Sequence, residues 1–194
     1  MKTLKFLTTA ILTSLLIASC SDDDDNGTPE EIIEEELITT MTVTLTPEGG
    51  GTTVTLKTLD IDGDGPGQPV ITVSDKLVAN TSYEGSIELL NETEDPAEDI
   101  TEEVDDLAEE HQFFYTIGNG LDANTEYEDF DKNDYPVGLE FNLETGDAST
   151  GTLTFTLRHE PKKPNTGLED AGGTTDISAT FNVEIEETMT TTVQ

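Results

Sequence analysis

The two histidines of the chain, His111 and His159, are the residues best suited to bind a transition metal ion. Side chains alternate between the two faces of a β-strand. His111 has the parity of Phe113 and Tyr115, and His159 has the parity of Leu157, so both imidazoles are expected to face the interior at strand ends. If the strands between them run alternately up and down, the two ends meet at the same end of the fold.

Carboxylates flank both histidines. Glu110 precedes His111, and Glu160 follows His159. Two imidazoles and a carboxylate are a ligand set that suits zinc, copper or iron, so we predict a site for zinc or copper at these four residues. Three protein ligands would leave one coordination position open, which suits transfer of the metal to a partner. The alternative is a pair of half-buried histidines with backbone or Glu partners and no metal.

A second candidate is a calcium loop at residues 60–65 (DIDGDG). Carboxylates at alternate positions and a glycine at the sixth match the first half of an EF-hand-like loop. The twelfth position is Ile71 where a bidentate Glu would stand, so the missing ligand has to come from elsewhere. The alternative is a glycine-rich turn whose aspartates favour turn geometry. The predicted calcium ligands are Asp60, Asp62, Asp64 and Gln68.

Residues 129–134 (DFDKND) have similar spacing. Here Lys132 intrudes and the sixth position lacks the glycine. We therefore interpret this segment as a polar loop that leads into the next strand.

Cys20 is the only cysteine of the chain, and it follows a basic start and a short apolar stretch at residues 6–18. Those features predict a secretory signal at residues 1–19, and the stretch is too short for a membrane span. The small residues before Cys20 resemble the lipobox of bacterial lipoproteins. That resemblance implies that Cys20 becomes the first residue and carries acyl chains that anchor the protein to a membrane. The alternative is an ordinary signal peptide with a chance cysteine.

An acidic run, Asp22 to Asp25, comes almost directly after Cys20. It resembles the export signal of Bacteroidota-type outer-membrane lipoproteins, which implies display at the cell surface; the alternatives are a solvated tether and the periplasmic face of the outer membrane. Residues 20–36 have few apolar side chains and dense like charge, so we expect a disordered tether there. Residues 188–194 are expected to be a disordered tail.

Net charge restricts the possible partners. The chain has 8 basic and 43 acidic residues, giving a formal charge of −35. Such a chain does not bind nucleic acid or anionic lipid through electrostatic attraction. Cations are the favoured ligands.

Apolar and polar residues alternate from residue 37 to 187, which predicts one β domain. A hairpin is expected across Gly49–Gly51, and another across the turn from Gly146 to Gly151. We predict an all-β fold, an antiparallel immunoglobulin-like β-sandwich of about nine strands. The strands are expected around residues 41–45, 54–56, 70–73, 83–89, 113–117, 127, 137–143, 153–157 and 177–185.

One helix is predicted between the fourth and fifth strands. Asp95 is expected to cap it, and Pro96 to occupy its first position. Ile100, Val104 and Leu107 form its apolar stripe. We expect this helix to lie on a crossover between the two sheets.

Two short segments around the histidines, residues 110–114 (EHQFF) and 157–161 (LRHEP), resemble a small family of Bacteroidota-type lipoproteins that is loosely named type 1 periplasmic-binding fold. The resemblance implies a ligand-binding or uptake accessory. The family's fold name denotes two lobes of alternating helices and strands, whereas the pattern of this chain predicts a sandwich.

Motifs of common enzymes are absent from the sequence: it has no Gly-x-Ser-x-Gly elbow, no phosphate-binding glycine loop and no His-Glu-x-x-His helix. The leading hypothesis is a membrane-anchored, non-enzymatic binding lipoprotein at the outer membrane, an accessory to ligand or metal uptake with an outer-membrane transporter. The alternatives are a structural or adhesive surface module stabilised by calcium, and a hydrolase.

Overall fold

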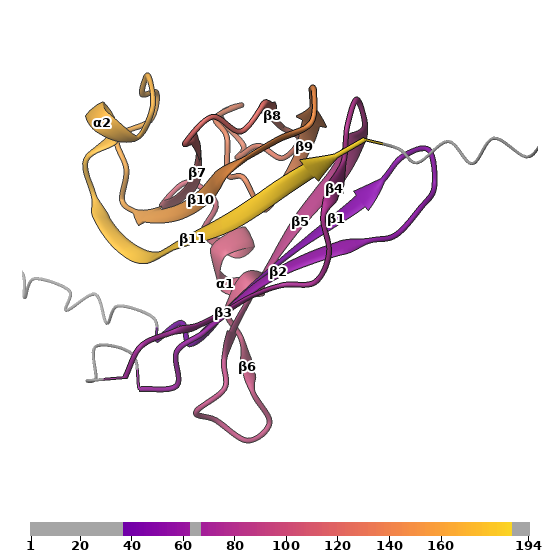
Figure 1. Cartoon of the computed structure of the whole chain (residues 1–194). Coiled ribbons are helices and arrows are strands. Elements are labelled where there is room, and N and C mark those ends of the chain that lie inside the picture. Colours follow the sequence, from indigo (N-terminus) through magenta and orange to yellow (C-terminus); the bar gives the residue numbers. More distant parts are fainter. Residues whose placement is uncertain (1–36, 63–66, 188–194) are drawn as a thin grey trace, which may run out of the picture. The chain divides into compact units, whose positions relative to one another are not determined.

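The computed structural model describes residues 37–62 and 67–187. The predicted signal peptide, Cys20, the acidic tether, Asp64 and the tail at 188–194 lie outside the described residues. Within the described part, strands dominate and the two helices are short. The predicted all-β sandwich is confirmed (Figure 1).

The first sheet has the strand order β3-β2-β1-β5-β9-β8. The short β6 also pairs with β5 but is not part of this order. All its pairings are antiparallel. The β1–β2 pairing confirms the hairpin predicted across the Gly49–Gly51 turn. The strands are β1 (Thr40–Pro47), β2 (Val54–Leu59), β3 (Val70–Val73), β5 (Ser82–Asn91), β6 (Glu98–Asp99), β8 (Ala123–Tyr127) and β9 (Glu140–Thr145).

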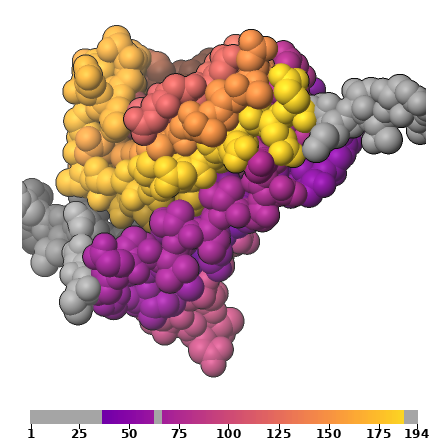
Figure 2. All heavy atoms as spheres, viewed as in Figure 1, coloured from indigo at the N-terminus to yellow at the C-terminus, as the bar shows by residue number. Residues whose placement is uncertain are grey.

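The second sheet has the order β4-β11-β10-β7. Its long strands are antiparallel, and the two-residue β4 pairs parallel with β11. Figure 2 shows β7, β10 and β11 side by side on one face of the molecule. The strands are β4 (Leu77–Val78), β7 (His111–Gly118), β10 (Ser149–His159) and β11 (Thr174–Glu186), and helix α2 (Leu168–Ala171) lies between β10 and β11 in the chain.

The core lies between the sheets and is built from alternate residues of each strand. Phe141 of the first sheet lies 5.7 Å, ring to ring, from Phe155 of the second. A Cβ at Gly85 would collide with the ring of Phe141, so the bare backbone of β5 makes room for this aromatic side chain. Burial of such large rings supplies much of the hydrophobic driving force for the sandwich.

The hairpin predicted across the turn from Gly146 to Gly151 is wrong. β9 belongs to the first sheet, and β10 belongs to the second. At the end of β9 the N–H of Gly146 donates to the carbonyl of Asp122, 2.7 Å away, and the chain then crosses to the other sheet. Both strands bury one apolar face, so alternation alone fits a hairpin and a crossover equally well.

The predicted helix exists, but its predicted start is wrong. Helix α1 covers Ile100–Asp106, and its N-cap is Asp99, whose carboxylate accepts the N–H of Thr101 at 2.9 Å. Residues 98–99 pair with the end of β5, so the backbone is still extended there and the helix begins at Ile100 instead of Pro96. As predicted, α1 connects the first sheet to the second, through β6 and β7 (Figure 1).

Neither helix in the described part of the chain has the length and apolar character needed to cross a membrane.

Candidate metal centre

The two histidines meet at one end of the second sheet. His111 is the first residue of β7, His159 is the last residue of β10, and the two are direct partners in the β7–β10 ladder. Nδ1 of His159 lies 3.1 Å from Nε2 of His111, and the rings are edge to face with centroids 4.8 Å apart. The expectation that both histidines face inward at the same end is therefore confirmed, although 48 residues separate them.

Hydrogen bonding determines where the ring protons lie in the neutral pair. Nδ1 of His111 is 3.2 Å from the carbonyl oxygen of Leu107, which can only accept, so this nitrogen carries its hydrogen. Nε2 of His111 then carries no hydrogen, and its lone pair accepts the Nδ1–H of His159. It follows that Nε2 of His159 also carries no hydrogen and is a hydrogen-bond acceptor.

Nε2 of His159 is a buried acceptor that lacks a hydrogen-bond donor among the described residues. His159 is 8% exposed, and its Nε2 has no hydrogen-bond partner among the described residues. A buried acceptor without a donor costs about 1–3 kcal/mol of stability. The cost belongs to the tautomer in which Nδ1 of His159 carries the hydrogen.

Burial also keeps His111 uncharged. The side chain is fully buried, and burial lowers the pKa of His111 to about 4, while the Leu107 carbonyl raises it and the neighbouring His159 and Lys163 lower it further. His111 is therefore neutral at pH 7. Metal ions bind the neutral imidazole.

The carboxylate that joins the histidines is Asp176 on β11. One nitrogen from each histidine and one carboxylate oxygen of Asp176 lie within 4.8 Å of one another, and within 37–62 and 67–187 these residues form the single such group of three. Glu110 and Glu160, the carboxylates expected from the sequence, are exposed. Their backbones meet instead, since the N–H of Glu160 donates to the carbonyl of Glu110 at 2.6 Å.

Sequence reasoning missed Asp176 because its parity is that of the outward-facing residues of β11. The inward residues Ile177, Ala179 and Phe181 alternate with exposed ones, and Asp176 precedes that series by one position. A β-bulge changes its direction, since the β10–β11 register shifts between Leu157 and Arg158. The paired glycines at 172–173, directly before β11, are a weak sequence signal of irregular backbone there.

Next to the histidines, Lys163 links three segments. Its Nζ donates to the carbonyl of Ala108 at 2.7 Å and lies 3.3 Å from Oδ2 of Asp131. Asp131 also accepts the N–H groups of Asn133 and Tyr135. The loop at 129–134 is thus organised by its own hydrogen bonds, in agreement with the polar loop predicted from its sequence.

The predicted calcium loop is only partly described. The carboxylate of Asp62 accepts the N–H of Gly67 at 2.9 Å. Gln68 is exposed, and the backbone N–H of Asp60 donates to the carbonyl of Thr39. Asp64 lies outside the described residues, so calcium binding stays a prediction.

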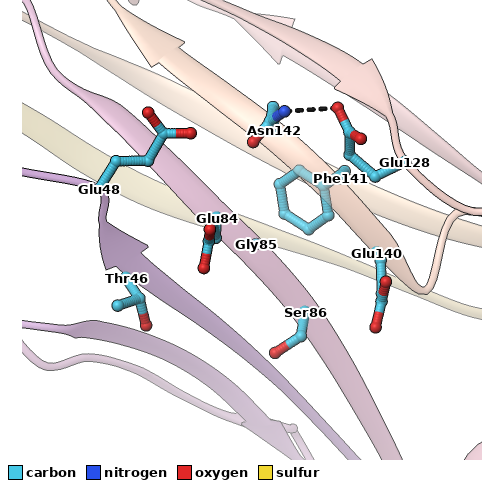
Figure 3. Close-up of a pocket in the computed structure, with 9 residues that line it drawn as sticks. All are labelled: Thr46, Glu48, Glu84, Gly85, Ser86, Glu128, Glu140, Phe141 and Asn142. Atoms are coloured by element: carbon cyan, nitrogen blue, oxygen red, sulfur yellow. Dashed lines mark hydrogen bonds between the residues drawn. The ribbon is translucent and has the colours of Figure 1, made fainter.

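The outer face of the first sheet carries a polar depression of about 570 Å³ (Figure 3). Asn142 donates to Glu128 at its rim. The carboxylates on this surface disfavour anionic ligands by repulsion. Exposed carboxylates are well solvated by water, so their presence does not by itself indicate a ligand site. The lining residues are Thr46, Glu48, Glu84, Gly85, Ser86, Glu128, Glu140, Phe141 and Asn142.

No protein family, curated protein or solved structure matches this chain.

Proposed function

We propose that this chain is a lipid-anchored, non-enzymatic binding protein of the outer membrane, and that its β-sandwich binds a transition metal ion at His111 and His159. The observation that carries the proposal is the contact between the two imidazoles, which are 3.1 Å apart and buried. The lipobox-like sequence before Cys20 supports the anchor. In this role the protein serves metal uptake, together with an outer-membrane transporter.

The distance between the imidazoles is compatible with a shared ion. Two ligands about 2.0–2.1 Å from a tetrahedral metal are roughly 3.3 Å apart, close to the 3.1 Å between Nε2 of His111 and Nδ1 of His159. An ion can therefore bind between Nε2 of His111 and Nδ1 of His159 with little movement of the strands, and the hydrogen that Nδ1 of His159 carried moves to Nε2 of the same ring. The Leu107 carbonyl already orients the His111 ring through Nδ1, as backbone carbonyls commonly do for metal-binding histidines.

Charge favours the same class of ligand. With 43 acidic and 8 basic residues, the chain concentrates cations at its surface and repels anions. A tethered module of this composition is suited to metal capture close to a membrane.

Metal titration tests this function. Zinc and copper should bind the full chain with a stoichiometry of one, and His111→Ala and His159→Ala should each lower the affinity at least about tenfold, since each removes a ligand. Gln112→Ala is the matched control, because Gln112 is also a buried polar residue of β7. If both histidine variants bind zinc and copper as the wild type does, the pair is structural, and the calcium-stabilised surface module becomes the better account.

The anchor is tested separately. Cys20→Ala should move the protein from the detergent phase to the aqueous phase, and mass spectrometry should show acylated Cys20 as the first residue of the mature wild type. Deletion of Asp22 to Asp25 should leave the lipid in place but protect the protein from protease added to intact cells. Unchanged protease accessibility would contradict the export role of the acidic run.

A further inference from the structure

The β-bulge at the start of β11 has a specific consequence for the histidine site. Leu157 pairs with Ile177, but the next residue, Arg158, pairs with Thr175. Asp176 is thus the additional residue that β11 inserts opposite this step of β10. Bulges re-aim side chains and occur frequently beside functional sites. Here the bulge brings the carboxylate to the inner side of the sheet, where it joins the group formed by the two imidazoles.

We propose that Asp176 is the third protein ligand of a metal ion held by His111 and His159, and that the ion is a divalent first-row transition metal of the zinc type. This inference rests on the proposed function, and it adds the ligand and the class of metal. The sequence gives no indication of this residue as a ligand.

An independent observation points to a cation at this place. Nε2 of His159 belongs to a side chain that is 8% exposed and has no hydrogen-bond partner among the described residues. Buried polar atoms in native proteins are nearly always paired, so an exception calls for an explanation. An ion bound at Nδ1 of His159 would move the hydrogen of that ring to Nε2, which is then no longer a buried acceptor without a donor.

The distances between the ligand atoms of the group are close to those of a tetrahedral metal site, and a small movement would complete it. The two imidazoles already have the spacing of tetrahedral ligands, whereas the largest separation in the group is 4.8 Å, compared with roughly 3.3 Å in a tetrahedral site. Metal binding therefore has to bring the three ligand atoms closer by about 1–2 Å, a shift within the reach of side-chain rotation because Asp176 is only half-buried.

The donor set selects the class of metal. Calcium requires six to eight oxygen ligands, and magnesium prefers an octahedron of oxygens. Two imidazole nitrogens and one carboxylate oxygen suit zinc and the related divalent ions instead. Three ligands from the described residues also leave a position for water or another donor.

The test uses the full chain in detergent, stripped of metal and titrated with zinc, and with cobalt as a spectroscopic probe. Asp176→Asn keeps the size of the side chain and removes its charge. We expect this variant to bind zinc at least about tenfold more weakly and to give a cobalt d–d absorption spectrum that differs from that of the wild type. Glu110→Gln and Glu160→Gln each remove one negative charge next to a histidine, and they should bind both ions as the wild type does.

The outcomes separate this inference from the proposed function. If His111→Ala and His159→Ala lose zinc but Asp176→Asn keeps both wild-type affinity and the wild-type cobalt spectrum, Asp176 is not a ligand and only the inference fails. If neither histidine variant weakens binding, the proposed function fails as well.

Should Asp176→Asn fold poorly, zinc-induced shifts of the histidine ring ¹⁵N and Asp176 carboxylate ¹³C resonances in the wild type test whether Asp176 is a ligand. A carboxylate resonance that does not respond to zinc would overturn the assignment.

Discussion

Lys163 and Asp131 form a buried ion pair beside the histidine site. Their charged atoms lie 3.3 Å apart, and the two side chains are 6% and 1% exposed. Burial alone would raise the pKa of Asp131, but the backbone N–H groups of Tyr135 and Asn133 together with Lys163 hold it below its usual value. Burial lowers the pKa of Lys163 against the opposing effect of Asp131. Each group therefore helps to keep the other charged in its buried position.

Removing one member of this pair should be costly. We expect Lys163→Met to lower the free energy of unfolding by about 3 kcal/mol, because it leaves the Asp131 carboxylate buried without its cation. Urea denaturation measures the change. Lys76→Met is the control, since Lys76 pairs with Glu184 at a surface where the two side chains are 45% and 48% exposed, and exposed pairs contribute less than about 1 kcal/mol. Equal effects of the two substitutions would contradict the structural role of Lys163.

Acid should destabilise the metal-free protein through His111. The folded-state pKa of this histidine is about 4, lowered chiefly by burial, whereas in the unfolded chain it is near 6.5. Between these values the unfolded state binds more protons, so stability is full above about pH 6.5 and falls as the pH drops towards 4. The loss attributable to His111 is about 3 kcal/mol.

Denaturation at a series of pH values in the presence of chelator measures this loss. Other groups of the protein also contribute to the pH dependence of stability, so the informative quantity is the difference between the wild type and His111→Gln. The variant should lose less stability than the wild type between pH 6.5 and 4.5. Identical pH profiles would show that His111 is not the group that titrates.

Gly173 should tolerate alanine less well than Gly172. Both have positive φ, +69° and +66°, so alanine strains either position by about 1–3 kcal/mol. A Cβ at Gly173 would in addition collide with the carbonyl oxygen of His159, whereas a Cβ at Gly172 meets open space. We expect Gly173→Ala to cost about 2 kcal/mol more and to weaken zinc binding, because it displaces His159 and the start of β11. Equal melting temperatures for the two variants would contradict this.

Calcium should stabilise the fold if the loop at 60–68 binds it. A ligand at tenfold excess over its Kd adds about 1.4 kcal/mol, and weak extracellular calcium sites have Kd values of about 0.1–1 mM. The thermal midpoint in millimolar calcium should exceed that in sodium chloride of equal ionic strength, and Asp62→Asn should abolish the difference. If the variant keeps the calcium-specific shift, the loop at 60–68 is not the calcium site.

The sequence by itself determined most of the strands and the meeting of the two histidines. Alternation of apolar and polar residues is a local property, and it correctly located strands as different as β3 and the weak β8. The same parity argument placed His111 and His159 on the inner face at one end of the sheet, because both lie on regular strands without an interruption.

Only the tertiary structure decided the rest. The assignment of β9 and β10 to different sheets depends on non-local hydrogen bonds, and the start of α1 depends on the pairing of β6 with β5. Asp176 enters the site through a bulge, and one inserted residue reverses the direction of a side chain that alternation would turn outward. Parity predicts side-chain direction only while the register is unbroken, and the ladder between β10 and β11 breaks at the step that brings the carboxylate to the histidines.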